Sequence, residues 1–229
     1  MGIILSFITY VFVIIACLKG ISNIMILCGR RDLKNDLSIT KKGLTGGVFL
    51  QGLFDILFMG RLFRVNKLLW IGEWTFHVSF ILTLIGHLRY ILYPVPKWAV
   101  VMNCIGKYAG ILLPLSLLFV LFVRLSLSER SDYLSPRNFF LILLILILGT
   151  TGVIMRFFIK PDIVGIKNYI MDLLTFNPGD LPPGSLFVIH YSLFLVLLLY
   201  LPTHILAAPF IIFESRKRTS TTKIIEYDE

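Results

Sequence analysis

Long apolar stretches separated by shorter polar ones dominate the pattern along the 229-residue chain. A helix needs about 20 mostly apolar residues to cross the hydrocarbon core of a bilayer. Alternating ten-residue segments, the pattern of membrane β-barrels, are absent, and a spanning helix satisfies its own backbone polar groups. The pattern therefore predicts an all-α integral membrane protein with five transmembrane helices, at about residues 3–28, 68–92, 108–123, 138–159 and 185–213.

Composition supports a membrane protein. Hydrophobic residues make up 57% of the chain and charged residues 15%, whereas soluble domains carry about 25% charged residues. No linker separates two globular parts and no internal repeat is present, so residues 1–229 are expected to form a single membrane domain. The polar parts are a basic loop at 29–67, a turn-rich loop at 160–184 and a short tail at 214–229.

The distribution of Lys and Arg predicts the orientation. If the chain crosses five times, the loop at 29–67, the loop around 124–137 and the tail share one side, which carries fifteen of the 22 basic residues. The opposite side carries six, and Lys19 lies inside the first span. The positive-inside rule places the N-terminus outside and the C-terminus in the cytoplasm of a multi-pass protein of the cell membrane. The net charge of +9 then reflects topology, and no nucleic-acid partner is expected.

The second half of the basic loop, "VFLQGLFDILFMGRLFRVNK", is amphipathic. One interpretation is an interfacial helix on anionic lipid. The other is a docking surface for a cytoplasmic partner, and the sequence leaves both open.

Cysteine chemistry is not indicated. "VIIAC" ends at Cys17 like a lipoprotein signal, but no positive segment precedes it and the apolar character continues to Cys28. Together with Cys104, these residues form no C-x-x-C or haem-attachment motif. We expect each of the three cysteines to be a small, buried hydrophobic side chain.

All four histidines fall in two of the predicted spans: His77 and His87 in "TFHVSFILTLIGHLRY", and His190 and His204 in the fifth helix. On a helix, ten residues correspond to about 15 Å and fourteen to about 21 Å. Each helix therefore presents one imidazole toward each membrane face. A single intramembrane histidine often serves only a hydrogen bond between helices, but two pairs are harder to explain in that way.

Helices two and five run in opposite directions, so histidines at matching depths can pair across them. His77 and His204 lie toward the cytoplasm, whereas His87 and His190 lie toward the outside. Two axial imidazoles are a means of holding b-type haem without covalent attachment. The pattern therefore predicts an inner haem on the first pair and an outer haem on the second. Gly86, Gly149 and Gly152 could admit a flat ring or only permit close helix packing, and Pro202 should kink helix five.

Two other classes of function remain alternatives. A small transporter could use the intramembrane histidines and Lys19 as a proton or metal path, although the third and fourth spans are almost free of polar residues. The second alternative is an assembly anchor whose histidines make only structural contacts.

The histidine motif resembles a known family. "FHVSFILTLIGH" is similar to the second helix of the gamma subunit of respiratory nitrate reductase, a five-helix dihaem cytochrome b. The upstream "GLFDILFMGRLFRVNKLLW" looks more like the membrane cytochrome subunits of heterodisulfide-reductase-type and sulfate-respiration complexes, and "VIHYSLFLVLLLYLPTHILAAP" resembles the fifth helix. His77, His87 and His190 match family haem ligands. His204 falls about one turn before the expected last ligand position, which is Ala208 here.

The resemblance implies two haem b groups and electron transfer between a menaquinol-like membrane quinol and a cytoplasmic iron–sulfur subunit of the heterodisulfide-reductase type. It also allows for further membrane and extracytoplasmic subunits. Lys107, expected to open the third helix on the outside, takes the position of a lysine tied to the family's quinone site. An interfacial anchor is the competing interpretation of Lys107.

Overall fold

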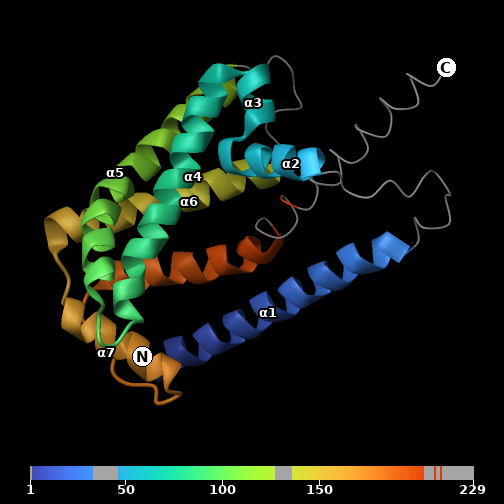
Figure 1. Ribbon diagram of the computed structural model, residues 1–229. Coiled ribbons are helices and arrows are strands. Elements are labelled where there is room, and N and C mark those ends of the chain that lie inside the picture. Colours follow the sequence, from blue (N-terminus) through green and yellow to red (C-terminus); the bar gives the residue numbers. More distant parts are fainter. Residues whose placement is uncertain (1, 33–45, 127–135, 204–208, 210–211, 213–229) are drawn as a thin grey trace, which may run out of the picture. The chain divides into compact units, whose positions relative to one another are not determined.

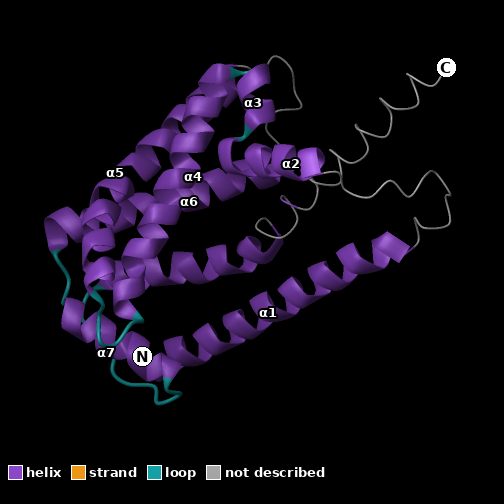
Figure 2. Ribbon diagram, in the orientation of Figure 1, coloured by secondary structure: helices purple, strands orange, loops and turns teal. Residues whose placement is uncertain are grey.

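The computed structural model describes residues 2–32, 46–126, 136–203, 209 and 212. Figures 1 and 2 show that helices form nearly all of these residues, and no strand occurs among them. The predicted all-α class is therefore confirmed. The elements are α1 (Gly2–Asp32), α2 (Gly46–Phe58), α3 (Gly60–Val65), α4 (Lys67–His87), the 3₁₀ turn η1 (Leu88–Tyr90), α5 (Lys97–Ser126), α6 (Pro136–Ile154), the π-helical turn η2 (Met155–Ile159), α7 (Ile163–Leu174) and a last helix at Ser185–Thr203.

The chain divides into two compact units. One consists of Met1–Val11 and Asn66–Leu197, and the other consists of Phe12–Val65 and Leu198–Glu229. Each unit is described by itself below. All described candidate site residues belong to the first.

Five helices of the described chain are long and apolar enough to cross a membrane, so the expected multi-pass protein is confirmed. Four of these spans agree with the predicted ranges to within a few residues over the described chain: Gly2–Ile26, Lys67–Tyr90, Asn138–Ile159 and Ser185–Thr203. The end of the fifth predicted helix, at residues 204–213, falls mostly outside the described residues.

The predicted start of the third span at Tyr108 is wrong. Helix α5 begins at Lys97, eleven residues earlier. Pro96 sets this start, because its carbonyl accepts hydrogen bonds from the backbone N–H groups of Ala99 and Val100. The charge of Lys107 interrupted the apolar pattern in the sequence, but one lysine does not interrupt a helix whose other residues favour it.

In the second unit, the amphipathic segment forms two helices rather than one. Met59, between α2 and α3, has φ of 49° and so breaks the helix. Asp55 is buried on the inner face of α2, at 3% exposure, and its carboxylate lies 3.4 Å from Nε of Arg61. The large apolar side chains of α2, including Phe54 and Leu57, are exposed on its other face. The exposed apolar side chains are compatible with both expectations for this segment, an interfacial helix on lipid and a docking surface for a partner.

The expected loop at 160–184 contains a helix, α7, so that part of the prediction is wrong. Asp162 caps it by accepting a hydrogen bond from the backbone N–H of Val164. Ile166, Tyr169 and Leu173 are buried along one face, and burial raises the pKa of the Tyr169 phenol. The hydroxyl of Ser6 in α1 donates to the Tyr169 hydroxyl oxygen at 3.4 Å, which ties the start of the chain to this helix.

Helices α4 and α5 form an antiparallel pair that organises the first unit (Figure 1). At one end Gly86 faces Gly106 so closely that a Cβ on Gly106 would lie 3.3 Å from the Gly86 Cα. At the other end Glu73 of α4 pairs with Arg124 of α5. Helix α6 packs on α5 through Gly149, where a Cβ would lie 2.7 Å from the Leu113 side chain. Gly86 and Gly149 thus allow close helix packing.

Candidate functional site

His77 lies near the middle of α4 with its ring fixed by the helix backbone. Its Nδ1 is 2.7 Å from the carbonyl oxygen of Glu73, four residues earlier. A carbonyl oxygen only accepts hydrogen bonds, so Nδ1 carries the proton. The Nε2 atom then keeps its lone pair. The side chain is 42% exposed and so accessible to a ligand.

His87 repeats this arrangement at the end of the same helix. Its Nδ1 lies 2.7 Å from the carbonyl oxygen of Thr83 and must also donate. The same reasoning leaves Nε2 of His87 as the nitrogen with a free lone pair.

His190, on the last helix, reaches the same state through a side chain. Its Nδ1 is 2.9 Å from the Thr151 hydroxyl of α6. That hydroxyl donates its hydrogen to the Leu148 carbonyl at 2.8 Å, so its oxygen accepts the Nδ1 proton of His190. Gly152 makes room for the ring, since a Cβ there would lie 3.2 Å from Cε1 of His190.

The three described histidines therefore share one tautomer. Metal-ligating histidines usually donate the second ring N–H to a carbonyl or another oxygen, which fixes the tautomer and the ring orientation. A neutral imidazole with Nε2 free is the form that binds haem iron. Because a haem brings its own iron, one imidazole from each of two helices suffices. The donor set thus fits haem, although the described residues contain no cluster of three or more His, Cys, Asp or Glu that could hold a bare metal ion.

His87 and His190 both belong to the first unit. Their sharing of one iron, as the expected outer pair, stays a prediction. His204, the expected partner of His77, lies outside the described residues. Its pairing with His77 therefore stays a prediction.

Lys107 lies inside α5 rather than at its start, yet at the depth that a role beside His87 requires. It follows Gly106, which faces Gly86, and Gly86 precedes His87. Its Nζ lies 5.3 Å from the ring centroid of Phe157 in η2 and 5.6 Å from that of Tyr108. The ammonium group is therefore positioned among aromatic faces, level with the His87 end of α4.

A shallow hollow of about 270 Å³ lies between α4 and α5, and Tyr108 is one of its lining residues on α5. Its lining is almost entirely apolar, with Trp74, Val78 and Leu82 on the α4 side. Such a surface suits a flat apolar ring or a lipid tail.

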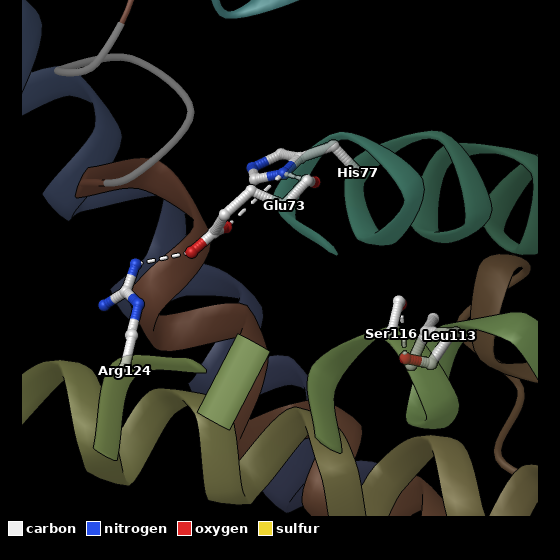
Figure 3. A network of polar contacts seen from close by, with 5 residues as sticks. All are labelled: Glu73, His77, Leu113, Ser116 and Arg124. Carbon is white, nitrogen blue, oxygen red and sulfur yellow. Dashed lines mark hydrogen bonds and ion pairs between the residues drawn. The ribbon is translucent and has the colours of Figure 1, made fainter. Parts of the chain in front are cut away.

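Sequence reasoning missed the residues that fix the histidines. Glu73 is an acid inside a span, one turn before His77, and Figure 3 shows it between His77 and Arg124. The signal was present, because an intramembrane acid needs a partner. Thr151 gave no comparable signal, since threonines in spans commonly bond their own helix backbone.

The fold and these side chains define a multi-pass helical membrane protein in which three described histidines each bond an oxygen through Nδ1. The chain is similar to the Hdr-like menaquinol oxidoreductase cytochrome b-like subunit of Archaeoglobus fulgidus, with 32% identity over 149 residues, which is 58% of this chain and 45% of that protein. The protein of the same name from Archaeoglobus profundus is 24% identical over 182 residues, covering 67% of this chain and 54% of its own. No protein-family model matches, and no solved structure matches.

The expected resemblance to membrane cytochromes of the heterodisulfide-reductase type is therefore confirmed. The chain spans about half the length of the curated relatives it matches. At the level that their names support, it resembles a membrane cytochrome b subunit of a quinol oxidoreductase.

Proposed function

We propose that the chain is a dihaem b-type cytochrome subunit that transfers electrons between a menaquinol-like quinol and a cytoplasmic iron–sulfur subunit. The observation that carries the proposal is the common tautomer of His77, His87 and His190, each with Nδ1 bonded to an oxygen and Nε2 free. The names of the two relatives support a menaquinol substrate and an assembly of the heterodisulfide-reductase type.

The histidines divide between two haem sites. His87 and His190 would hold one haem b, and His77 and His204 would hold the other. These groups supply one-electron redox chemistry, and the protein sets their position and potential. The hydrogen bonds to Nδ1 increase the basicity of the ligating nitrogen, which favours the ferric state.

Lys107 is the residue that we assign to the quinol. Oxidation of a quinol to a quinone releases two protons and two electrons. The Lys107 ammonium can donate a hydrogen bond to a quinol or quinone oxygen, and the rings of Phe157 and Tyr108 offer faces for the head group. Its depth beside His87 supports a reaction near the proposed outer pair. Protons would then leave on the outside while electrons move inward.

Loss of individual ligands tests the pairing. Replacing His87 or His190 with Ala should remove the same haem, because one iron needs both imidazoles. The reduced-minus-oxidised visible spectrum of each purified variant should therefore lose the same α-band component. His77→Ala should remove the other component. Loss of spectroscopically different haems in His87→Ala and His190→Ala would show that the two residues do not share an iron.

A further inference from the structure

Two arginines of the described chain each carry a buried side-chain donor without a partner. They are Arg89 and Arg124, and in both the unpaired atom is Nε. Leaving a buried donor unsatisfied is unfavourable, and more so when the group is charged. Buried polar groups in native proteins are nearly always hydrogen-bonded, so an exception points to a missing partner.

Arg124 of α5 is held against Glu73, which lies one helical turn before His77 in α4. Its Nη2 pairs with the Glu73 carboxylate, and the backbone carbonyl of Glu73 accepts the Nδ1 proton of His77. The carboxylate itself lies 4.0 Å from the same ring nitrogen. Figure 3 shows the three side chains in line, with the guanidinium beyond Glu73 as seen from His77. Glu73 therefore acts as a positioning residue for both the imidazole and the guanidinium.

Arg89 is held near His87 in a comparable way. It lies two residues after His87, in η1. Its Nη2 donates to the Tyr90 hydroxyl at 2.8 Å, and its guanidinium carbon lies 4.7 Å from the centre of the Tyr90 ring. As in Arg124, the Nη2 atom has a hydrogen-bond partner, whereas the Nε atom has none.

The missing partner must match an edge of a guanidinium group. The Nε–H and a neighbouring Nη–H point in parallel, and a carboxylate can accept both at once. Such bidentate pairs are stronger and more directional than contacts of a lysine ammonium. Nη2, the nitrogen on the same edge as Nε–H, already has one partner in both arginines, Glu73 for Arg124 and Tyr90 for Arg89. The Nε–H and the second Nη2 hydrogen remain for a carboxylate from outside the described residues.

We propose that Arg124 and Arg89 each bind a propionate carboxylate of the haem held by the neighbouring histidine, Arg124 at His77 and Arg89 at His87. This inference rests on the proposed dihaem function. Haem b carries two propionates on one edge of its ring and no covalent attachment to the protein. One arginine per site compensates the negative charge where water is scarce, and fixes the rotation of the ring about the bond to iron.

The positions of the two arginines along the helices agree with this role. Glu73, which holds Arg124, lies four residues before His77 toward the start of α4. Arg89 lies beyond His87, past the end of the same helix. The guanidinium groups therefore flank the two histidines on opposite sides along α4. This arrangement directs the propionates of the two haems toward opposite membrane faces.

Infrared spectroscopy of labelled haem tests the proposal directly. The purified chain is produced with ¹³C at the haem propionate carboxyls, and redox-difference spectra are recorded over the potential range of each haem. Arg124→Gln should shift the ¹³C-sensitive carboxylate bands of the His77 haem and lower its potential, because a positive charge is lost. Arg89→Gln should do the same only for the His87 haem. Arg64→Gln, an exposed arginine of α3, is the control and should move neither.

Unchanged ¹³C-sensitive bands in Arg124→Gln and Arg89→Gln, with both haems bound, would overturn the propionate contacts. If Arg124→Gln loses the haem at His77, the Arg124→Lys variant is compared instead. Lysine keeps the positive charge but lacks the two parallel N–H donors of the guanidinium. Shifted propionate bands in Arg124→Lys would support the contact, and unshifted bands would overturn it. Absence of haem from the wild-type chain is a different outcome, because it contradicts the proposed function itself before any variant is compared.

Discussion

Single side chains carry most of the chemistry in this protein through the partners that fix them. The Nδ1 proton of His77 is directed by a carbonyl of its own helix, whereas that of His190 is directed by Thr151 on another helix. Lys107 has aromatic neighbours on two elements, Tyr108 on α5 and Phe157 on η2. In each case the reactive atom remains available while the rest of the side chain is held.

Lys107→Ala tests the quinol contact at this scale. Loss of a charge-assisted hydrogen bond of about 1.5–3 kcal/mol should slow haem reduction by a menaquinol analogue about tenfold to a hundredfold. Haem content should not change, because Lys107 is not a ligand. Stopped-flow absorbance at the haem α-band measures the rate. Lys97→Ala, at the exposed start of the same helix, should react like the wild type. A wild-type rate for Lys107→Ala would make Lys107 an interfacial anchor.

The limits of prediction from sequence are clearest at the residue scale. The histidines were identified from residue type and span alone, because imidazoles in hydrocarbon are rare enough to be informative. Arg124, by contrast, was counted only as a loop charge. Its pairing with Glu73 joins positions 51 residues apart, and no local pattern in the sequence records such a contact.

At the scale of elements, close packing of α4 against α5 sets the depth of the site residues. The approach of Gly86 and Gly106 aligns His87 with Lys107, and the Glu73–Arg124 pair fixes the other end. The spans were predictable because apolar length is a strong signal, but α7 was not. Only Ile166, Tyr169 and Leu173 of its twelve residues are buried, and twelve residues are too few to give the length signal of a spanning helix.

Alanine substitution at glycines of α5 tests this alignment. A Cβ on Gly106 would lie 3.0 Å from the Leu82 carbonyl oxygen, whereas a Cβ on Gly110 meets nothing within 4 Å. Gly106→Ala should therefore destabilise the protein by about 1–3 kcal/mol through forced helix separation. Gly110→Ala should be neutral or slightly stabilising. Intrinsic tryptophan fluorescence during thermal unfolding in detergent compares them, and equal midpoints for the two variants would show that the helices do not depend on this contact.

At the scale of the whole molecule, the described residues contain five apolar spans, and most basic residues of the sequence lie on one side of the predicted topology. Quinol oxidation near His87 and His190 contributes to a membrane potential only if that end of the spans faces outside. The orientation is thus part of the proposed function, and it remains a prediction from the fifteen basic residues on the expected cytoplasmic side against six opposite.

Reporter fusions test the orientation. A fluorescent protein that folds only in the cytoplasm should be bright when fused after residue 229, and alkaline phosphatase, active only outside, should be inactive there. The same reporters inserted between Pro178 and Asp180 should give the opposite result, because this turn is expected outside. An active phosphatase at the C-terminal position would reverse the topology and place the quinol site on the cytoplasmic side.

The haem content of the purified chain tests most directly whether paired intramembrane histidines hold two haems. Pyridine haemochrome absorbance gives the amount of haem b, amino-acid analysis gives the amount of protein, and total iron provides an independent check. We predict two haem b groups and two iron atoms per chain. A preparation of folded protein with one haem per chain would contradict the two-pair arrangement, and one with none would contradict the assignment as a cytochrome.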